Sequence, residues 1–515
     1  MAQLSSTLHH PTQNGCILAL DIGTSSTRAI TFDFKGHKTG RIAQREYSQI
    51  TTPDGGVEVD ADFLLDLTAR CIDEVLGESD VPVVAVAVSC FWHSLMAVDV
   101  EHKPLTPVFS WADNRAAPWL APLRATMDEI EVHARTGCVF HTSYWPAKLL
   151  WLHHTQPALF SGDMRWISFG EYLALQFLGE ARVSLSMASG TGLFHQNNAD
   201  WDEEMLAAVP IGMENLSPLC DAHDDLGRLH STYHERWPAL RDTKWFPAIG
   251  DGAASNIGSG CVDASRIALN VGTSAALRVV LREYSGAPPS GLWRYRVDGK
   301  RSLLGGALSN AGSVWAWARN TFNLPPDADA QIAALRPDMH NLTVLPFLAG
   351  ERSPLWNANA RFVLEGASLD TEPVQILRAC LEATSLRFAD VAQRVCAATP
   401  QPNEQGRSTL EIVASGGALD RSASWRQIVC DCIGAPLVQS CEAEASARGV
   451  ALLALEACGI INDIADLAAE CGDIVQPNPE HHAVYKRALA RQNALYDQIY
   501  AAAQKSLFAS TRNLQ

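Results

Sequence analysis

A short pattern that occurs twice places the strongest constraint on the fold of this chain. In the first copy, a strand-like run over 16–20 leads through Asp21 into Gly23-Thr24-Ser25 and a second apolar run over 28–34. In the second copy, a strand-like run leads into Gly272-Thr273-Ser274 and another apolar run. Two strands joined by such a turn predict a β-hairpin. The copies lie about 250 residues apart, which predicts two related domains.

Strands and helices alternate along the rest of the sequence. The valine-rich run 81–89 predicts a buried central strand. Apolar residues at helical spacing predict helices over 62–76 and 375–395, and a terminal amphipathic helix over 485–504. The run 411–414 is a further strand that ends in a glycine turn. Because the chain has 515 residues, of which 47% are hydrophobic, it can bury more than one core. The mixture predicts the α/β class.

Charge and targeting signals limit the partners. The chain carries 40 basic and 57 acidic side chains, a net charge of −17, and so acidic a surface argues against binding nucleic acid or an anionic membrane. Residues 1–15 lack the basic and apolar regions of a signal peptide, and no run of about 18 apolar residues occurs. Thirteen cysteines without a CxxC pair are typical of buried thiols in a reducing compartment. We expect a soluble, cytoplasmic protein.

Common catalytic motifs are missing from the sequence. It contains no GxxxxGK[ST], GxGxxG, HExxH or GxSxG. What remains is the repeated pattern, in which the glycine lets the backbone approach an anion while hydroxyls and turn N–H groups bond phosphate oxygens. Asp21, at the end of a strand, is placed to hold Mg²⁺. One Gly-Thr-Ser turn is ordinary, but two copies, each after a strand and with Asp251 near the second, favour a phosphate site.

Further motifs follow one another in order along the chain. They are LALDIGTSSTRAITFD (18–33), CFWHSLMAVD (90–99), PLTPVFSWADNRA (104–116), AKLLWL (147–152), SMASGTGLF (186–194), IGDGAASNIGSG (249–260), NVGTSAALR (270–278), GGALSNAGSVWAW (305–317), LPFLAGERSPLWNANAR (345–361) and ASGGALDRSASWRQIVCD (414–431). This ordered set resembles the FGGY family of carbohydrate kinases, which shares a fold superfamily with actin, hexokinase and the Hsp70 chaperones. Within the family, HSLMAVD, WADNRA and LAGERSPLWNANAR look most like gluconate kinases (gluconokinases).

The resemblance implies an actin/hexokinase-like (ribonuclease H-like) ATPase fold of two α/β domains with an interdomain cleft. The N-terminal domain, 16–258, would carry the sugar and phosphate side, and the C-terminal domain, 259–505, the nucleotide side. The implied reaction is the transfer of a phosphoryl group from ATP, with Mg²⁺, to a sugar or sugar acid, with D-gluconate to 6-phosphogluconate as the first choice. Xylulose or another pentose or polyol is the alternative acceptor. A non-catalytic, nucleotide-dependent clamp and a homodimer both stay open.

The resemblance also implies roles for individual residues. Asp251 matches the catalytic aspartate that accepts the proton of the attacking hydroxyl, and Asp21 and Asp251 match the metal-linked carboxylates. The expected nucleotide and phosphate residues are Gly23, Thr24, Ser25, Arg28, Gly272, Thr273, Gly312, Gly416, Gly417 and Ala418. The expected substrate residues are His93, Ser94, Asp113, Arg115 and Asp251. If the substrate is gluconate, its carboxylate needs a cation, and Arg115 or Lys148 is the sequence-based hypothesis for it.

Overall fold

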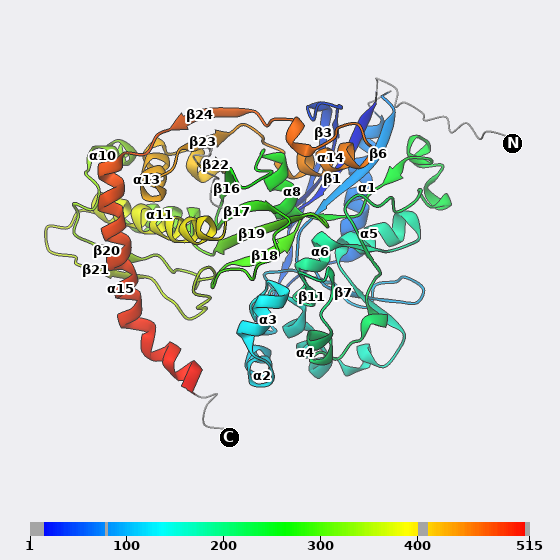
Figure 1. The fold of residues 1–515 in the computed structure, drawn as a ribbon, viewed down its shortest axis with the longest axis horizontal. Helices are drawn as coiled ribbons and strands as arrows, with labels where there is room; N and C mark the ends of the chain where they lie inside the picture. The colour runs from blue at the N-terminus through cyan, green and yellow to red at the C-terminus, as the bar shows by residue number, and fades with distance from the viewer. Residues whose placement is uncertain (1–14, 78–80, 400–409, 510–515) are drawn as a thin grey trace.

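Two β-sheets with the same central strand order organise the chain (Figure 1). The computed structural model describes residues 15–77, 81–399 and 410–509. The first sheet has the order β14-β6-β1-β2-β3, and β15 also pairs with β6. Its strands are β1 (Cys16–Ile22), β2 (Ser26–Phe32), β3 (Lys38–Glu46), β6 (Val83–Cys90), β14 (Lys244–Trp245) and β15 (Ile249–Gly250). Every residue of β1 is buried, because this strand lies between β2 and the parallel strand β6.

The second sheet has the order β18-β19-β17-β16-β22-β23-β24. Its strands are β16 (Arg266–Val271), β17 (Ala275–Arg282), β18 (Trp293–Arg296), β19 (Arg301–Leu308), β22 (Glu411–Ser415), β23 (Leu437–Ser440) and β24 (Cys471–Val475). The run β19-β17-β16-β22-β23 repeats the run β3-β2-β1-β6-β14 of the first sheet, with antiparallel pairs on one side and parallel pairs on the other. The predicted α/β, two-domain fold is therefore confirmed.

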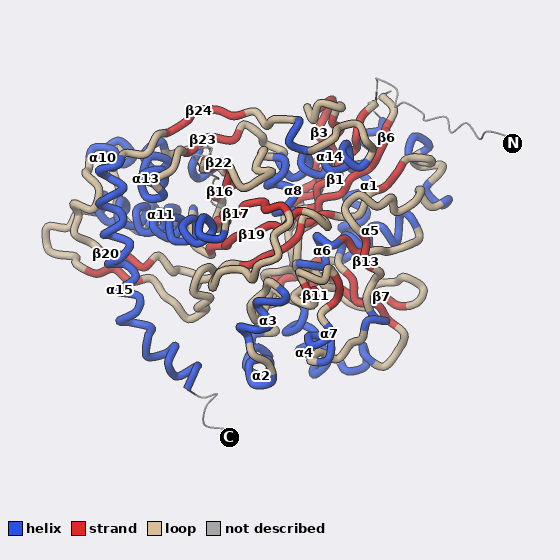
Figure 2. Tube along the Cα trace, viewed as in Figure 1, coloured by secondary structure: helices blue, strands red, loops and turns tan. Residues whose placement is uncertain are grey.

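Helices cover the two main sheets, and several small sheets lie beside them (Figure 2). The longer helices are α1 (Ala61–Gly77), α4 (Trp145–Thr155), α5 (Phe169–Leu178), α9 (Gly312–Thr321), α11 (Pro373–Ala398), α13 (Ala423–Ile433) and α15 (Pro479–Ala509). The shorter ones are α2 (Leu120–Thr126), α3 (Glu129–Thr136), α6 (Leu185–Ser189), α7 (Glu203–Ala207), α10 (Ala328–Ala334) and α12 (Gly417–Asp420). The remaining strands are β4 (Ile50–Thr51), β5 (Val57–Val59), β7 (Met96–Asp99), β8 (Val108–Phe109), β9 (Met164–Ile167), β10 (Val183–Ser184), β11 (Phe194–His195), β12 (Asp200–Trp201), β13 (Leu219–Cys220), β20 (Thr343–Leu345) and β21 (Val363–Glu365).

Two helices cross in direct backbone contact between the sheets. They are α8 (Asp251–Gly258) and α14 (Ala445–Ala457). A Cβ added at Gly258 would lie 1.8 Å from the carbonyl oxygen of Ala445, and one added at Gly449 would lie 1.8 Å from that of Ala254. Although α14 follows β23 in the sequence, it packs against β1 and β6 of the first sheet (Figure 1). The end of the chain thus returns to the first core.

One apolar run of the first sheet is interrupted as a strand. The apolar run at 245–249 forms two separate strands, β14 and β15, which both pair in parallel with β6. Between them, the Phe246 amide still donates to the Val86 carbonyl oxygen (2.9 Å). Pro247 has no N–H to continue the ladder, which explains the break.

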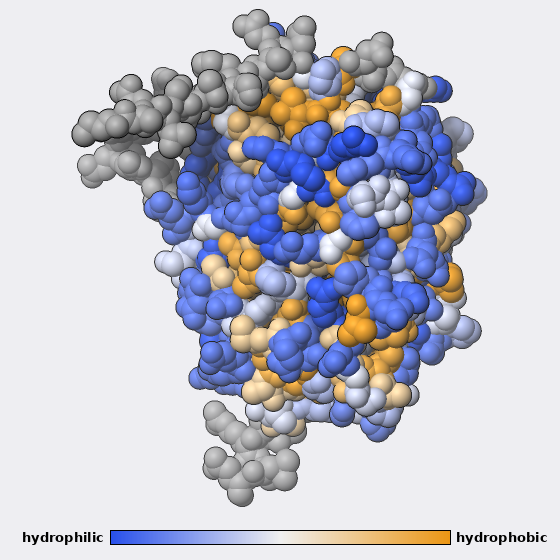
Figure 3. Space-filling view, turned by 90° about the vertical axis from the view of Figure 1, so that its right-hand side faces the viewer, coloured by the Kyte–Doolittle hydropathy of each residue, from blue (hydrophilic) through white to orange (hydrophobic). Residues whose placement is uncertain are grey.

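None of the helices within the described ranges is long and apolar enough to cross a bilayer. On the face shown in Figure 3, hydrophilic residues cover much of the area and hydrophobic residues show between them. All thirteen cysteines are free; Cys90 is buried, whereas Cys441 and Cys471 are exposed. Residues 1–14, on which the expectation about a signal peptide rests, lie outside the described residues.

Replacing Gly449 with valine tests the helix crossing. The added side chain would collide with the backbone of α8, so we expect the free energy of unfolding to fall by at least about 2 kcal/mol. Urea unfolding followed by circular dichroism measures the change. Gly77→Ala is the control, because a Cβ at Gly77 has no atom within 4 Å. Equal stability of the Gly449 variant and wild type would contradict the crossing.

Candidate active site

The first Gly-Thr-Ser turn is closed by its own backbone and held by Tyr47. The amide of Gly23 donates to the Ser26 carbonyl oxygen (2.9 Å). The Tyr47 amide donates to the Ser25 carbonyl oxygen (2.9 Å), and the Tyr47 hydroxyl donates to the Gly23 carbonyl oxygen (2.5 Å). Thr24 is half-buried and Ser25 is exposed. The turn is therefore fixed in shape while these two residues stay accessible.

The second turn is closed in the same way and is held by a helix. The Gly272 amide donates to the Ser274 carbonyl oxygen (2.9 Å). Amides at the start of α9 then donate to the turn, from Gly312 to the Gly272 carbonyl (3.0 Å) and from Ser313 to the Thr273 carbonyl (3.1 Å). A Cβ at Gly312 would lie 2.5 Å from the Gly272 carbonyl oxygen. Gly312 therefore allows α9 to close onto the turn, and Gly272 and Thr273 remain exposed.

The glycines after β22 differ in what they do. Gly416 has a φ of +107°, and a Cβ there would lie 2.3 Å from the Val271 carbonyl oxygen, so the backbone requires glycine. A Cβ at Gly417 would have no neighbour nearer than Arg421, at 3.9 Å, and this position is open. Ala418 is buried against the start of α9, 3.2 Å from the position of a Gly312 Cβ.

A cleft of about 480 Å³ joins the first hairpin to the second sheet. Its walls are Asp21, Arg28, Ser255, Asn270, Ser415, Gly416, Asp420, Gln439, Ser440, Cys441, Glu442, Ala443, Glu444, Ala445 and Ser446. The structure thus brings Asp21, Arg28 and Gly416 to one cleft, and their roles in binding a nucleotide stay predictions. The second turn, with Gly272 and Thr273, follows Asn270 of this wall, but its residues do not line the cleft itself.

Arg28 spans the cleft. Its guanidinium lies 3.4 Å from the Asp21 carboxylate and 3.6 Å from the Glu444 carboxylate. Its Nε donates to the Gln44 side chain (3.2 Å). Glu444 immediately precedes α14, so this ion pair links the first hairpin to a segment more than 400 residues later in the chain.

Asp21 and Asp251 lie at the same edge of the first sheet. Asp21, near the end of β1, is paired in register with Ser89 of β6, and Ile249 of β15 is paired with the same residue. Burial raises the pKa of each carboxyl, and the charge of Asp21 raises the Asp251 pKa further, while Arg278 opposes that rise. Two neighbouring carboxylates that repel each other are suitable oxygen ligands for Mg²⁺. The residues therefore fit the implied metal.

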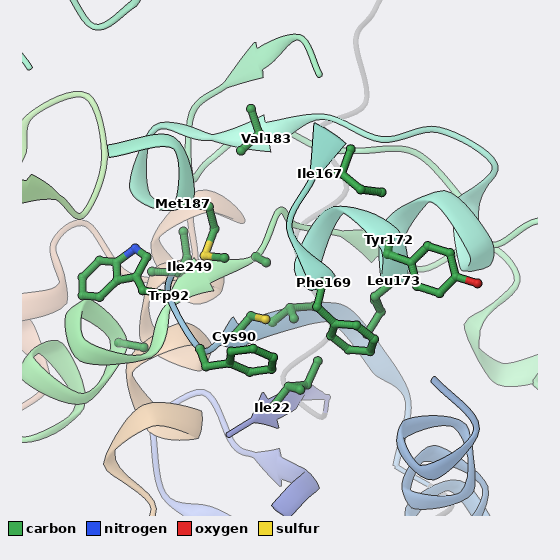
Figure 4. Packing of buried hydrophobic residues seen from close by; sticks show 14 of the residues in the cluster. Ile22, Cys90, Trp92, Ile167, Phe169, Tyr172, Leu173, Val183, Met187 and Ile249 are labelled. Carbon is green, nitrogen blue, oxygen red and sulfur yellow. The ribbon is translucent and has the colours of Figure 1, made fainter. Parts of the chain in front are cut away.

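Trp92 fixes the backbone around Asp251. Its indole N–H donates to the Ser186 carbonyl oxygen (3.0 Å), and Figure 4 shows the ring near Met187 and Ile249. A Cβ at Gly250 would lie 1.9 Å from the ring, and one at Gly252 would lie 2.7 Å from it. Glycine on both sides of Asp251 therefore lets the indole pack against the backbone. Sequence reasoning missed Trp92; the signal was a bulky aromatic residue immediately before the predicted ligand His93.

Two neutral histidines lie near a pair of tyrosines. The His93 Nδ1 donates to the Gly190 carbonyl oxygen (2.5 Å), which leaves Nε2 as an acceptor. The His141 Nδ1 accepts from the Ser143 amide (3.1 Å), which leaves Nε2 as a donor. Burial lowers the pKa of both rings to about 3. The His93 ring lies 5.2 Å from the Tyr144 ring and 5.6 Å from the Tyr295 ring, centre to centre, and the two tyrosine hydroxyls are 2.6 Å apart.

The other predicted substrate residues are bonded to the protein. The buried Ser94 hydroxyl accepts from the Phe169 amide (3.2 Å). The buried Asp113 carboxylate accepts from the Val57 amide (3.1 Å) and from Arg115 Nε (3.1 Å). Arg115 also forms an ion pair with Glu58. Their roles in substrate binding stay predictions.

Two arginines that the sequence analysis did not select interact electrostatically with the histidines and tyrosines described above. Arg278 lies on β17, in an otherwise apolar stretch of that strand, and Arg352 follows β20 in the GERSP segment. A charge inside a buried strand was the sequence signal for Arg278. The guanidinium of Arg352 lies 5.4 Å from the centre of the Trp111 ring, and burial lowers the pKa of both arginines.

Duplicated ribonuclease H-like sheets with a cleft between them define a two-domain fold of the actin/hexokinase type. Residues 16–258 match the N-terminal domain of the FGGY family of carbohydrate kinases, and residues 267–458 match its C-terminal domain. The chain belongs to the FGGY family of carbohydrate kinases and is an ATP-dependent sugar kinase.

Relatives of this chain are named as kinases of different substrates. The chain is 28% identical to a gluconokinase of Bacillus subtilis (strain 168), over 90% of this chain and 91% of that protein. It is 27% identical to a xylulose kinase of Escherichia coli (strain K12), over 82% and 85% respectively. A solved gluconate kinase from Lactobacillus acidophilus superimposes with a TM-score of 0.87 at 27% identity, covering 96% of this chain and 100% of that one.

The neutral histidines predict a loss of stability in acid. Below pH 6.5 the unfolded chain binds protons that folded His93 and His141 do not bind until about pH 3. The free energy of unfolding therefore falls as the pH falls through this window, by about 1–2 kcal/mol per histidine at pH 5.

Urea unfolding of wild type and His141→Asn at pH 7.5 and pH 5.0 measures this effect. The variant should lose less stability between the two pH values than wild type does. His37→Asn, at a side chain that is 62% exposed, is the control and should behave like wild type. An equal loss in His141→Asn and wild type would contradict the interpretation.

Proposed function

We propose that this chain transfers the γ-phosphoryl group of ATP to the terminal hydroxyl of D-gluconate and releases 6-phosphogluconate. The observation that carries the proposal is the position of Asp251. It interacts electrostatically with Asp21, which lines the cleft between the sheets, and with Arg278, which in turn interacts with Tyr295 beside His93. Similarity to proteins named gluconokinase and gluconate kinase supports gluconate as the acceptor. The E. coli relative supports xylulose as the second candidate.

Asp251 is the proposed general base. It accepts the proton of the attacking hydroxyl as that oxygen bonds to phosphorus, a contribution of about 10²–10⁴ in rate. Burial raises the carboxyl pKa, which makes it a stronger proton acceptor than an exposed aspartate. Alignment of the reacting groups contributes much of the rate, because phosphoryl transfer proceeds through a loose transition state. In such a reaction the protein mainly positions groups and neutralises charge.

The two hairpin turns are the proposed phosphate clasp. Thr24 and Ser25 would bond the phosphates from one sheet, and Gly272 and Thr273 from the other, with Arg28 adding charge near the γ-phosphate. Gly417 would leave space for the adenosine, while Gly312, Gly416 and Ala418 would shape the backbone around it. Asp21 and Asp251 would hold Mg²⁺, which supplies neutralisation of the phosphate charge when bound.

The histidines are the proposed hydroxyl ligands of the sugar. His93 presents an acceptor and His141 a donor, and neither Nε2 atom has a hydrogen-bond partner among the residues that the structure describes. Both rings are neutral, so they are suited to hydroxyl groups. Ser94, Asp113 and Arg115 would support the same site. Ser94 holds the start of α5, and Asp113, bonded to Arg115, holds the segment around Val57.

An acceptor panel tests the reaction. Release of ADP from Mg-ATP is measured with gluconate, xylulose, ribulose, glycerol and no sugar. We expect turnover with gluconate, and a fall in kcat of at least about 100-fold in Asp251→Asn because the base is removed. Asp473→Asn, at an exposed position of β24, is the control. Turnover with xylulose alone would keep the kinase and refute gluconate.

Asp21→Asn tests the metal site. Removing one of two oxygen ligands should raise the Mg²⁺ concentration for half-maximal activity about 10-fold. A Mg²⁺ titration at fixed ATP measures this shift, and calorimetry of ADP binding with and without Mg²⁺ gives a reading independent of turnover. An unchanged Mg²⁺ dependence in both measurements would refute the role of Asp21.

A further inference from the structure

We propose that Arg278 and Arg352 together bind the carboxylate of the sugar-acid substrate. The inference rests on the proposed function, because only an acidic acceptor has such a group. It replaces the sequence-based hypothesis that Arg115 or Lys148 is this cation, and it identifies the arginine pair as the determinant of specificity for an acid over a neutral polyol.

The Arg278 side chain has no hydrogen-bond partner among the residues that the structure describes. The residue lies on β17 opposite Gly305 of β19, and its Nε is buried without a hydrogen-bond acceptor. The side chain forms no ion pair with any residue in the described part of the chain either. Nε lies 3.1 Å from the position that a Gly252 Cβ would occupy, so the guanidinium is next to the segment that carries Asp251. A buried guanidinium nitrogen without an acceptor is costly, which indicates that an anionic ligand completes it.

Arg352 adds a second guanidinium with unused donors. One of its terminal nitrogens donates to the Leu308 carbonyl oxygen (3.2 Å), and this is the only hydrogen bond of its side chain within the described ranges. A guanidinium has five N–H donors, so most of them remain available. Arg278 lowers the pKa of Arg352, and both arginines interact electrostatically with Tyr295, which places the two cations in the same group.

The charge balance of this group favours an anion. The chain as a whole carries a net charge of −17, yet Arg278 interacts electrostatically with one carboxylate, Asp251, which the proposed reaction needs as its base, and the groups that act on Arg352 are Arg278 and two tyrosines. The rest of the group is neutral: His93 and His141 are unprotonated, and burial raises the pKa of the Tyr144 and Tyr295 hydroxyls. The planar arginine fork matches the two oxygens of a carboxylate.

The other cations near the group are already satisfied. Arg115 is neutralised by Asp113 and Glu58. Lys148 is fully buried, and its three donors face the carbonyl oxygens of Ser110 (2.7 Å), Ser143 (3.1 Å) and His93 (3.4 Å). Lys148 therefore has no donor left for a substrate carboxylate, and the charge of Arg115 is already compensated by two carboxylates.

The test compares two acceptors that differ only at the proposed contact. D-Glucitol has the carbon chain of D-gluconate with a CH₂OH group in place of the carboxylate. Arg278→Met and Arg352→Met should each raise the KM for gluconate about 100-fold, with kcat and the KM for ATP within about threefold of wild type. Calorimetric binding without ATP should show the same loss for gluconate and no change for glucitol. Arg278→Lys should retain part of the affinity, because it keeps the charge and loses the fork.

Controls and contrary outcomes separate the two proposals. Arg336→Met, at an exposed arginine, should behave like wild type, and thermal melts establish that the variants fold. A fall in kcat with gluconate at saturation and an unchanged KM would show that the arginines act on the transferred phosphoryl group, and this would overturn the inference. Wild-type enzyme that does not turn over gluconate would overturn the proposed function. If the wild type is selective for gluconate and the arginine variants keep that selectivity, the inference is overturned and the proposed function stands.

Discussion

The contact between α8 and α14 is the constraint on which the rest of this structure depends. Gly258 and Gly449 let the two helix backbones touch, and any side chain at either position would meet a carbonyl oxygen. Because α8 begins with Asp251 and α14 follows Glu444, the crossing fixes the position of a carboxylate from each half of the chain. The crossing also packs a late segment onto the first sheet, so neither sheet is independent of the other.

Around this crossing, the site combines rigid backbone with uncompensated charge. Gly250 and Gly252 admit the Trp92 ring against the backbone, and the turns are closed by their own hydrogen bonds. Asp21 and Asp251 are held close although burial and mutual repulsion disfavour their ionised forms. Arg278 lacks a protein acceptor. Such an arrangement costs stability in the unliganded protein, and bound cations and anions offset that cost.

Much of the fold could be predicted from the sequence because its signals are local. Apolar runs and a glycine turn define the hairpins β1–β2 and β16–β17, and helical spacing defines α1 and α11. The site was predictable where a residue sits at a strand end, as Asp21 does. It was less predictable where the partner is remote. Arg115 was a candidate for a substrate cation, yet Glu58, 57 residues earlier in the chain, forms an ion pair with it.

The sequence by itself determined the α/β class, the duplicated hairpins and the family, because periodicity and ordered motifs are properties of neighbouring residues. Only the tertiary structure decided which polar side chains are free. Lys148 and Arg278 are both single cations in apolar segments, but three carbonyl oxygens surround Lys148, whereas none meets Arg278. Hydrogen bonding depends on distances across the fold, and the acceptors of Lys148 come from three separate loops that only folding brings together.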